Sequence, residues 1–578
     1  MTKILATLFI VTVLTCSASG AEPQAYDLLA GDWTRFSGAV PVKGGVEITP
    51  LDRKIRPRAG GGKWYFNPPV NLCGPRLDLT GDFQISAVID NTKNPEKSAF
   101  LDFYGSIPIC YDEWRIDGKN VRFGLKNGIL EIWLNMKKQN FLKKGLSGAV
   151  EIGLSGSGGF LKFSVNGAEI GKAKDTVFTD SKIYFGADAE AGGGFLLQSL
   201  SACGSGVSIH DNYHECIRSY PVNPDSLRAR ASRLTHEFWI GTAGNVEPLM
   251  SDPQYGKTLA CEFSMVTPEM CLKFQAVHPQ EQSYAWAEAD ALVDFADVNG
   301  MRIHGHCLVW HEALPGWVWE IYANGKGDRD RMKSVMTEHI TALVTRYKGK
   351  IEEWDLLNEI FSHDFQTLDA NHPYGLRNGK EEESDPSVWF WAMGPSYILE
   401  AIRAARAADP ACELWINEFG IDQASNSKIV DNVLSLIGYI ESNGEKIDGV
   451  GFQAHNYDPE GDPSVASECL KNMARISAKG VKVRISELDV AGASKRPALF
   501  SDKLAVCCDF VKNPLCRSFG MWGFTDKYGS MSDPVNGGES GDNYSSPNWG
   551  AHYADSLLYD SSYHQKSAYQ ALLRVLQP

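Results

Sequence analysis

The sequence lacks three features that would point to other classes of protein. It has no dense run of Lys or Arg, its net charge is −15 and its pI is near 5.4, whereas a phosphate backbone is bound through a basic patch. No CxxC pair occurs among its 13 cysteines, so a zinc ribbon is not supported. After the N-terminal segment, no apolar run approaches the roughly 18 residues of a membrane span. These absences argue against a nucleic-acid partner, structural zinc and a membrane-spanning chain.

The N-terminus is typical of a secretory signal peptide. Lys3 precedes an apolar run, Ile4 to Leu14, and small residues follow it up to Ala21. That run is too short to cross a bilayer stably and ends at a suitable cleavage site, which predicts a signal peptide of residues 1–20. A lipid anchor on Cys16 is the rival interpretation. We therefore expect a secreted, extracellular protein with no membrane attachment after cleavage.

The remaining cysteines predict few disulfides. Disulfides are allowed outside the cell, but most of these cysteines lie in apolar runs that are typical of buried thiols. The best pairing is Cys516 with Cys508 or Cys507, because a short loop joins them.

Residues 24–203 have the pattern of an antiparallel β-sandwich. Short alternating runs such as FQISAVID and LKFSVNG are separated by turn residues such as Asn127-Gly128 and Asn166-Gly167. The segment also contains the aromatic residues Trp33, Trp64, Tyr65, Phe66, Tyr104, Tyr111, Trp114 and Trp133. Some of them must be core residues, and others would suit a carbohydrate-binding module, which is an argument by analogy. Residues 204–225 are interpreted as a linker.

From residue 226 to 578 strand-like runs alternate with helical stretches. Runs such as RIHGHCLVWH and ELWINEFGI are followed by amphipathic segments such as RMKSVMTEHITALVTRYKG. Eight such strand and helix pairs predict a (β/α)8 TIM barrel. In that fold the active-site residues lie at the C-terminal ends of the strands.

Polar and aromatic side chains gather where those strands should end. They are Glu269, Lys273, His306, Trp310, His311, Asn358, Glu359, Gln453, His455, Glu487, Asp489 and Trp522. Two of them, Glu359 and Glu487, end the fourth and seventh strands. Cleavage of a glycosidic bond needs one carboxylic acid that protonates the leaving oxygen and one carboxylate that attacks or stabilises the anomeric carbon. This pair therefore fits a glycoside hydrolase.

Several motifs resemble those of glycoside hydrolase family 10, the endo-β-1,4-xylanase family. In chain order they are HGHCLVWHEALPGW, WDLLNEI, GFQAHN, RISELDV, MWGFTDKY and the C-terminal segment LLYDSSYHQKSAYQALLRVL. This is also the order in which the family has them. The resemblance implies that Glu359 is the acid/base, that Glu487 is the nucleophile and that configuration is retained, for which carboxyl groups lie about 5–5.5 Å apart. It assigns substrate contacts to Glu269, Lys273, His306, Trp310, Asn358, Gln453, His455 and Trp522. It implies a monomer with no cofactor and no metal, acting on a plant cell-wall polysaccharide, xylan or a related β-1,4-glycan.

Three positions depart from the family's usual pattern. Met270 stands where an Asn is common, Ala313 where a Gln is common, and Ser530 where a second Trp is common. All three substitutions fall around the subsites on the non-reducing side. They leave the chemistry intact but put the sugar preference in question, and Trp549 is one residue that could replace the lost platform.

Three alternatives follow from these residues. The altered subsites could favour a β-1,4-glucan or mixed-linkage glucan over xylan, because selectivity between glucose and xylose depends on room for a 6-hydroxymethyl group. The chain could instead bind a polysaccharide without cleaving it. His304 and His306 form an H-x-H pair, which points two imidazoles to one face of a strand as metal-dependent barrel hydrolases require. In those metal-dependent hydrolases the pair lies on the first strand and is joined by further His and Asp ligands. Neither the position nor the partner ligands agree in this sequence.

Overall fold

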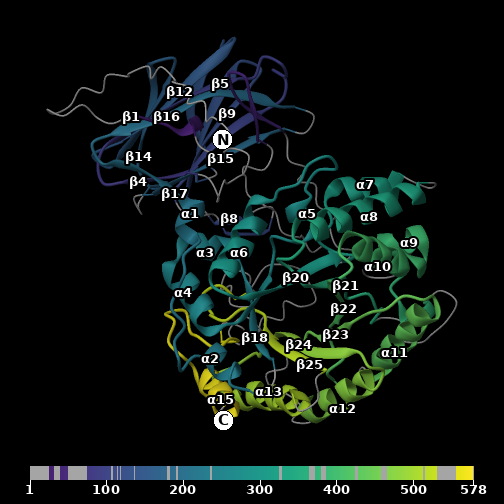
Figure 1. Ribbon diagram of the computed structural model, residues 1–578. Coiled ribbons are helices and arrows are strands. Elements are labelled where there is room, and N and C mark those ends of the chain that lie inside the picture. The colour runs from purple at the N-terminus through teal and green to yellow at the C-terminus, as the bar shows by residue number, and fades with distance from the viewer. Residues whose placement is uncertain are drawn as a thin grey trace, which may run out of the picture. The chain divides into compact units, whose positions relative to one another are not determined.

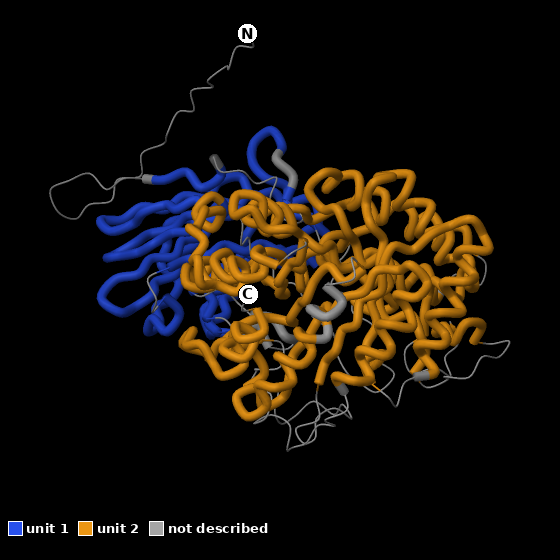
Figure 2. Tube along the Cα trace, turned by 60° about the horizontal axis from the view of Figure 1, so that its bottom comes forward, with its two compact units in different colours: residues 1–51, 68–109, 116–213 blue, residues 52–67, 110–115, 214–578 orange. Residues whose placement is uncertain are grey.

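The chain forms two compact units. The computed structural model describes residues 25–30, 39–49 and 75–576, except 106–108, 113–114, 118, 136, 179–181, 191–192, 235–236, 325–327, 364–371, 379–385, 424–426, 457–464, 512–514 and 530–554. The first unit spans residues 1–51, 68–109 and 116–213, and the second spans 52–67, 110–115 and 214–578 (Figure 2). The predicted signal peptide, Ser530 and Trp549 lie outside the described residues.

The first unit contains two antiparallel sheets (Figure 1). One has the order β14-β13-β12-β5-β16-β3-β2, with β1 also paired to β16, and the other has the order β11-β10-β9-β6-β15-β4-β17. The strands are β1 Ala25–Asp27, β2 Ala39–Val42, β3 Gly45–Ile48, β4 Pro75–Leu79, β5 Phe83–Asp90, β6 Ala99–Tyr104, β9 Asn120–Lys126, β10 Ile129–Leu134, β11 Lys137–Lys143, β12 Ala149–Ser157, β13 Phe160–Val165, β14 Ala168–Lys174, β15 Lys182–Ala189, β16 Phe195–Gly204 and β17 Val207–Asp211. A short separate pair joins β7 Ile109–Asp112 and β8 Arg115–Asp117.

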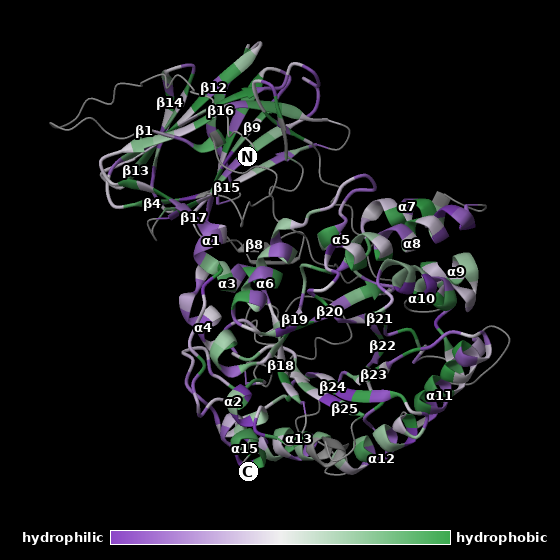
Figure 3. Cartoon of the chain, viewed as in Figure 1, coloured by the Kyte–Doolittle hydropathy of each residue, from purple (hydrophilic) through white to green (hydrophobic). Residues whose placement is uncertain are grey.

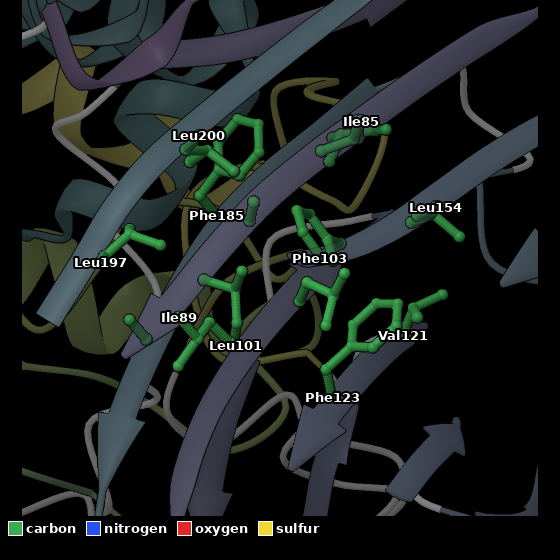
Figure 4. Close-up of a cluster of buried hydrophobic side chains, with 14 of the residues drawn as sticks. Ile85, Ile89, Leu101, Phe103, Val121, Phe123, Leu154, Phe185, Leu197 and Leu200 are labelled. Carbon is green, nitrogen blue, oxygen red and sulfur yellow. The ribbon is translucent and has the colours of Figure 1, made fainter. Parts of the chain in front are cut away.

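Both sheets contribute one face to a shared hydrophobic core. Alternation along β5 turns Ile85 and Ile89 inward, and β6 contributes Leu101 and Phe103 from the opposite sheet (Figure 4). Edge-to-face contacts between aromatic rings extend across this core. The predicted antiparallel sheets are therefore present, whereas the carbohydrate-binding character of this unit stays a proposal.

The segment 204–225 is more ordered than the expected linker. Val207–Asp211 forms β17, which pairs with β4, and Asn212–Cys216 forms the short helix α1. Val207 is buried in the core of the first unit. The sequence VSIHD alternates apolar and polar residues, so it can extend a sheet edge, and the first unit continues to residue 213.

The second unit is a closed barrel of eight parallel strands, β18 to β25, surrounded by helices (Figure 1). The strands are β18 Trp239–Gly244, β19 Met265–Pro268, β20 Arg302–Val309, β21 Glu353–Asn358, β22 Glu413–Glu418, β23 Gly449–Phe452, β24 Lys482–Leu488 and β25 Cys516–Met521. The helices are α2 Leu227–Ala231, α3 Val246–Ser251, α4 Pro253–Glu262, α5 Phe274–Val277, α6 Ala287–Val298, α7 Gly316–Asn324, α8 Arg329–Arg346, α9 Val388–Met393, α10 Ser396–Ala408, α11 Ser427–Ser442, α12 Val465–Ser477, α13 Pro497–Val511 and α15 Ser567–Val575. Pairing of β18 with β25 closes the ring and confirms the predicted TIM barrel.

Burial explains why these segments form strands and covering helices. The barrel strands are buried on both faces, as parallel strands with helices outside must be. The outer helices carry hydrophobic and hydrophilic residues together (Figure 3), and the buried ones, such as Ile398 and Ile402 of α10, recur at helical spacing. Among the described helices, none has the length and apolarity that a bilayer crossing requires.

Two cysteines of the predicted disulfide, Cys507 and Cys516, are free thiols. Cys507 on α13 and Cys516 on β25 are both buried, and their thiols lie within hydrogen-bonding reach of each other without a covalent bond. The predicted pairing of Cys516 with Cys507 is therefore not formed in this structure. The side chain of Cys508 lies outside the described part of the chain.

Candidate active site

Glu487 lies at the C-terminal end of β24 and is held by two hydrogen-bond donors. The amide Nδ2 of Asn417 donates to its Oε1 at 2.6 Å, and Nε2 of His455 contacts its Oε2 at 3.1 Å. The side chain is only 4% exposed. Burial alone would raise the pKa of Glu487, but the hydrogen bond from His455 and the nearby imidazoles outweigh burial and lower it. Glu487 is therefore held as a carboxylate.

His455 bridges two carboxylates, which fixes its protonation. Its Nδ1 lies 2.9 Å from Oδ1 of Asp489, while Nε2 faces Glu487. Burial opposes the charged ring, yet Asp489 and Glu487 together raise the pKa of His455 well above its ordinary value. Both ring nitrogens then carry protons and donate, so the imidazolium orients Glu487 and compensates its charge.

Glu359 follows the last residue of β21 and receives two further donors. Nε1 of Trp310 donates to its Oε2 at 3.0 Å, and Nε2 of Gln453 donates to its Oε1 at 2.9 Å. The backbone of Glu359 is left-handed, with φ of 52°. Its N–H donates to the carbonyl of Asn417, and its own carbonyl accepts from Nε of Arg377, each at 2.9 Å. These bonds maintain an unfavourable backbone geometry of the kind found at functional sites.

A chain of amides connects the two carboxylates. Asn417 donates to Oδ1 of Asn358 at 2.9 Å as well as to Glu487. Gln453 donates to the same oxygen of Asn358 at 3.3 Å and also to Glu359. The amides of this chain and the two carboxylates lie in, or directly after, the strands β21, β22, β23 and β24, so the barrel itself sets the spacing of Glu359 and Glu487.

Aromatic rings and one ammonium group form the wall beside the carboxylates. Nζ of Lys273 lies 4.9 Å from the ring centroid of Trp310 and 5.7 Å from that of Trp522. Trp522 packs edge-to-face on His306, with centroids 5.2 Å apart, and on His455, at 6.3 Å. Flat apolar rings with hydrogen-bonding groups at their edges suit the faces and hydroxyls of pyranose sugars.

The H-x-H pair is engaged by acidic residues rather than open for a metal ion. His306 contacts Asp355 at 2.9 Å, and His304 contacts Glu353 at 2.8 Å and Asp355 at 2.9 Å. Arg484 lies against the same carboxylates. Among the described residues, no group of three or more His, Cys, Asp and Glu is arranged to hold a metal ion.

Glu269 lies at the end of the second barrel strand, next to one of the three unusual positions. Its Oε2 accepts from Nδ2 of Asn245 at 2.6 Å. Burial raises the pKa of Glu269 to about 7, although the positive charge of Lys273 and the hydrogen bond from Asn245 act in the opposite direction. Met270 directly follows it without a polar side chain. Ala313, the second unusual position, is left-handed at φ 49° and accepts a backbone hydrogen bond from Gln275.

The structure adds residues that the sequence interpretation did not assign to the site. Asn417 is the penultimate residue of β22 and contacts both Asn358 and Glu487, while Asp355 orients His306 and Arg377 holds the backbone of Glu359. Asn417 had a signal in the sequence, because it is a polar residue at the end of a barrel strand, the position that the TIM-barrel rule marks. Arg377 had none, since it lies in a loop far from any recognised motif.

Comparisons with known proteins point to one family of enzymes. Glycosyl hydrolase family 10 matches residues 229–575. Endo-1,4-beta-xylanase B of Thermotoga neapolitana is 27% identical over 377 residues, which cover 63% of this chain and 94% of the relative. Endo-1,4-beta-xylanase 3 of Hypocrea jecorina is 30% identical over 353 residues, covering 61% of this chain and 85% of the relative. The solved structure of xylanase 10B from Thermotoga maritima has a TM-score of 0.50 at 29% identity and covers 61% of this chain and 98% of that one.

The family match covers more than half of the sequence and coincides with the barrel that carries the two carboxylates. The chain therefore belongs to glycosyl hydrolase family 10 and is a glycoside hydrolase.

Proposed function

We propose that the chain is a secreted endo-1,4-β-xylanase that cleaves the xylan backbone with retention of anomeric configuration. The observation that carries this proposal is the pair of carboxylates at the ends of β21 and β24, one of which is held ionised in a buried site. The relatives named above are endo-1,4-beta-xylanases, and one similar solved structure is a xylanase in complex with xylobiose.

In the first step, Glu487 attacks the anomeric carbon while the bond from that carbon to the leaving oxygen breaks. Glu359 gives its proton to that oxygen, and a covalent glycosyl–enzyme intermediate forms. In the second step, ionised Glu359 takes a proton from water, whose oxygen attacks the anomeric carbon and releases Glu487. This mechanism requires carboxyl groups about 5–5.5 Å apart, and that separation stays a prediction.

The contacts of Glu487 support its role as nucleophile. A nucleophilic carboxylate must stay ionised inside a site from which the substrate excludes water, and the imidazolium of His455 and the amide of Asn417 favour that state. Glu359 receives its hydrogen bonds from an indole and an amide, which carry no charge. Different surroundings are what allow two carboxyl groups to take different roles.

The remaining site residues fit the substrate contacts expected from the family. Asn358 lies between Asn417 and Gln453, where its amide can donate to a sugar 2-hydroxyl beside the two carboxylates. Trp310 and Trp522 supply ring faces, while Lys273 and Glu269 supply charged hydrogen-bonding groups toward the non-reducing side. No cofactor is required for this chemistry.

A β-1,4-glucanase or mixed-linkage glucanase is the second candidate. Met270 and Ala313 favour it, because both replace polar contacts that the family commonly offers on the non-reducing side, and Ala313 is also smaller than the Gln common at its position. Glucose carries a 6-hydroxymethyl group that xylose lacks, so the choice depends on space at these subsites. A polysaccharide-binding protein without turnover is the third candidate and would retain Glu359 and Glu487 without product release.

The test is release of reducing ends from xylan, mixed-linkage β-glucan and carboxymethyl cellulose by the mature protein. The Glu487→Gln variant should lose release of product, and Glu413→Gln, at the opposite end of a barrel strand, should retain it. Release from xylan that the first variant abolishes supports the proposal, and preference for a glucan supports the second candidate. Absence of release from all three substrates by folded protein would refute both hydrolytic functions.

Retention can be measured directly. Proton NMR of the first product formed from a xylo-oligosaccharide should show the β-anomer before mutarotation. Initial formation of the α-anomer would refute the double-displacement mechanism and would require carboxyl groups farther apart, about 6.5–9.5 Å.

We further propose that the mature protein is a monomer that begins at Ala21 and that its first unit binds polysaccharide. N-terminal sequencing of protein recovered from the medium tests the cleavage, and retention of a signal or a lipid on Cys16 would contradict it. Light scattering tests the monomer. Binding of the proteolytically separated first unit to insoluble xylan or cellulose tests the last proposal.

A further inference from the structure

One face of the seven-stranded sheet in the first unit points away from the hydrophobic core, and its composition differs from an ordinary solvated face. The strand register sets its side chains in rows across the sheet. One row runs through Asp188, Phe100, Gly124, Glu131 and Leu142, and the next runs through Gly186, Asp102, Arg122, Trp133 and Lys138. Their neighbours along β6, β9, β10 and β15 belong to the core, so alternation turns these rows outward.

The ring of Trp133 packs over Gly124 on this outer face. A Cβ placed on Gly124 would come within 2.7 Å of Cζ3 and 3.0 Å of Cη2 of Trp133, and within 3.0 Å of Cε1 of Phe100. The missing side chain of Gly124 therefore lets both rings rest on the strand, where they contact each other with centroids 6.3 Å apart. Both rings are partly exposed. Among the described residues, none accepts a hydrogen bond from the indole N–H of Trp133.

Charged groups surround these rings as neutralised pairs. Asp102 is fully buried and accepts from Nε of Arg122 at 2.8 Å and from Nη2 at 3.0 Å. The guanidinium of Arg122 also lies 4.8 Å from the ring centroid of Phe100. Next to Trp133, Lys138 forms an ion pair with Glu131. A face that is only solvated needs no buried bidentate ion pair. The pair of Asp102 and Arg122 fixes the guanidinium beside the rings of Phe100 and Trp133.

We propose that this face, made by Phe100, Asp102, Arg122, Gly124, Glu131 and Trp133, binds a chain of β-linked pyranose sugars independently of the catalytic site. One pyranose ring stacks on the partly exposed Trp133 indole beside Lys138, whose Nζ lies 5.9 Å from the ring centroid. The charged pairs and the indole N–H hydrogen-bond to the hydroxyls of that sugar. The charges of Asp102 and Arg122 cancel, as do those of Glu131 and Lys138, and Asp188 adds negative charge, so the face favours a neutral polysaccharide over an anionic polymer. The inference rests on the proposed function for one point only: its ligand is the polysaccharide that the barrel cleaves.

The experiment measures binding by the full mature chain carrying Glu487→Gln, so that the ligand is not consumed. Isothermal titration with xylohexaose and, separately, cellohexaose should show two sites per chain for the preferred sugar. Adding Trp133→Ala should remove one site or weaken it about 30-fold, as loss of a dominant aromatic contact does. Gly124→Ala should weaken the same site while keeping the indole, because the new methyl group lifts the ring.

Phe160 provides the matched control. It is 43% exposed on β13 of the other sheet, and Nζ of Lys172 lies 4.2 Å from its ring centroid, so it is also an exposed aromatic residue beside a cation. Phe160→Ala should keep both sites. Thermal melting of each variant establishes that the first unit is folded, and Trp133→Phe, which keeps a ring, should retain part of the affinity.

The outcomes separate this inference from the proposed function. Unchanged binding in folded Trp133→Ala and Gly124→Ala variants, or equal loss in Phe160→Ala, would overturn the inference while leaving hydrolysis by the barrel intact. Loss of one site in Trp133→Ala, together with no product release by the parent enzyme, would support the inference and overturn the proposed function. A single site that Trp133→Ala leaves unchanged would also overturn the inference.

Discussion

Replacing Asn417 by Ala should impair catalysis although this residue is completely buried. Asn417 has 0% exposure, and its amide donates at once to Oε1 of Glu487, at 2.6 Å, and to Oδ1 of Asn358, at 2.9 Å. Its own Oδ1 accepts from Oγ of Ser486 at 2.6 Å. The side chain is therefore fixed on three sides and can act on the reaction only through its neighbours.

The expected magnitude follows from the lost contact. A hydrogen bond to a charged group contributes about 1.5–3 kcal/mol, which corresponds to about a 10- to 150-fold loss in kcat/KM. The pKa of Glu487 should also rise, because one of the groups that favour its ionised form is gone. The loss should thus be greatest on the acidic side of the pH profile, while KM for short xylo-oligosaccharides changes little.

The assay is the pH dependence of kcat and KM for a soluble xylo-oligosaccharide. Asn472→Ala is the matched control, because Asn472 is also buried and donates one hydrogen bond, to the carbonyl of Ile421 at 2.9 Å, outside the site. It should lower stability without lowering kcat. A folded Asn417→Ala variant with kcat/KM within about threefold of the parent, a difference below 1 kcal/mol, would refute the positioning role of this amide.

Three further predictions concern pH and stability. His455→Ala should raise the pKa of Glu487 and move the acidic limb of the kcat/KM profile to higher pH, since the imidazolium now lowers that pKa against burial; an unmoved limb would contradict this. Burial raises the pKa of Glu269 from 4.5 to about 7, so the folded state binds this proton more tightly than the unfolded state and loses stability as pH rises through that window. In urea unfolding, the free energy of unfolding of Glu269→Gln should rise relative to that of the parent between pH 4.5 and about pH 7, and the difference should stay constant above pH 7. A difference that is equal at all pH values would refute the raised pKa of Glu269. Lys503→Met should lower the free energy of unfolding by about 3–5 kcal/mol, because it leaves the fully buried carboxylate of Asp422 without its ion-pair partner. The variant should keep the kcat of the parent. A small loss of stability, measured by denaturant unfolding, would contradict the buried pairing.

Much of the architecture could be predicted because it depends on local patterns. Alternation in segments such as FQISAVID requires one face toward a core, and the strands of the first unit form where this pattern predicts them. Strand-like runs separated by amphipathic segments predicted a barrel, and the closed ring of eight strands confirms that prediction. The stretch 204–225 was less predictable, because the single strand β17 is stabilised by its pairing with β4, a distant segment.

The sequence by itself determined the (β/α)8 class and the family, and it predicted which two carboxylates form the catalytic pair, since side chains at the ends of parallel strands gather at one end of the barrel whatever the loops do. Only the tertiary structure decided which groups surround them. It placed His455 between Asp489 and Glu487, and Asn417 between Asn358 and Glu487. These contacts join residues from different strands, and their distances depend on how the closed barrel sets the register of each strand against the next. The charge state of Glu487 follows from those distances and from burial, which no local pattern in the sequence contains.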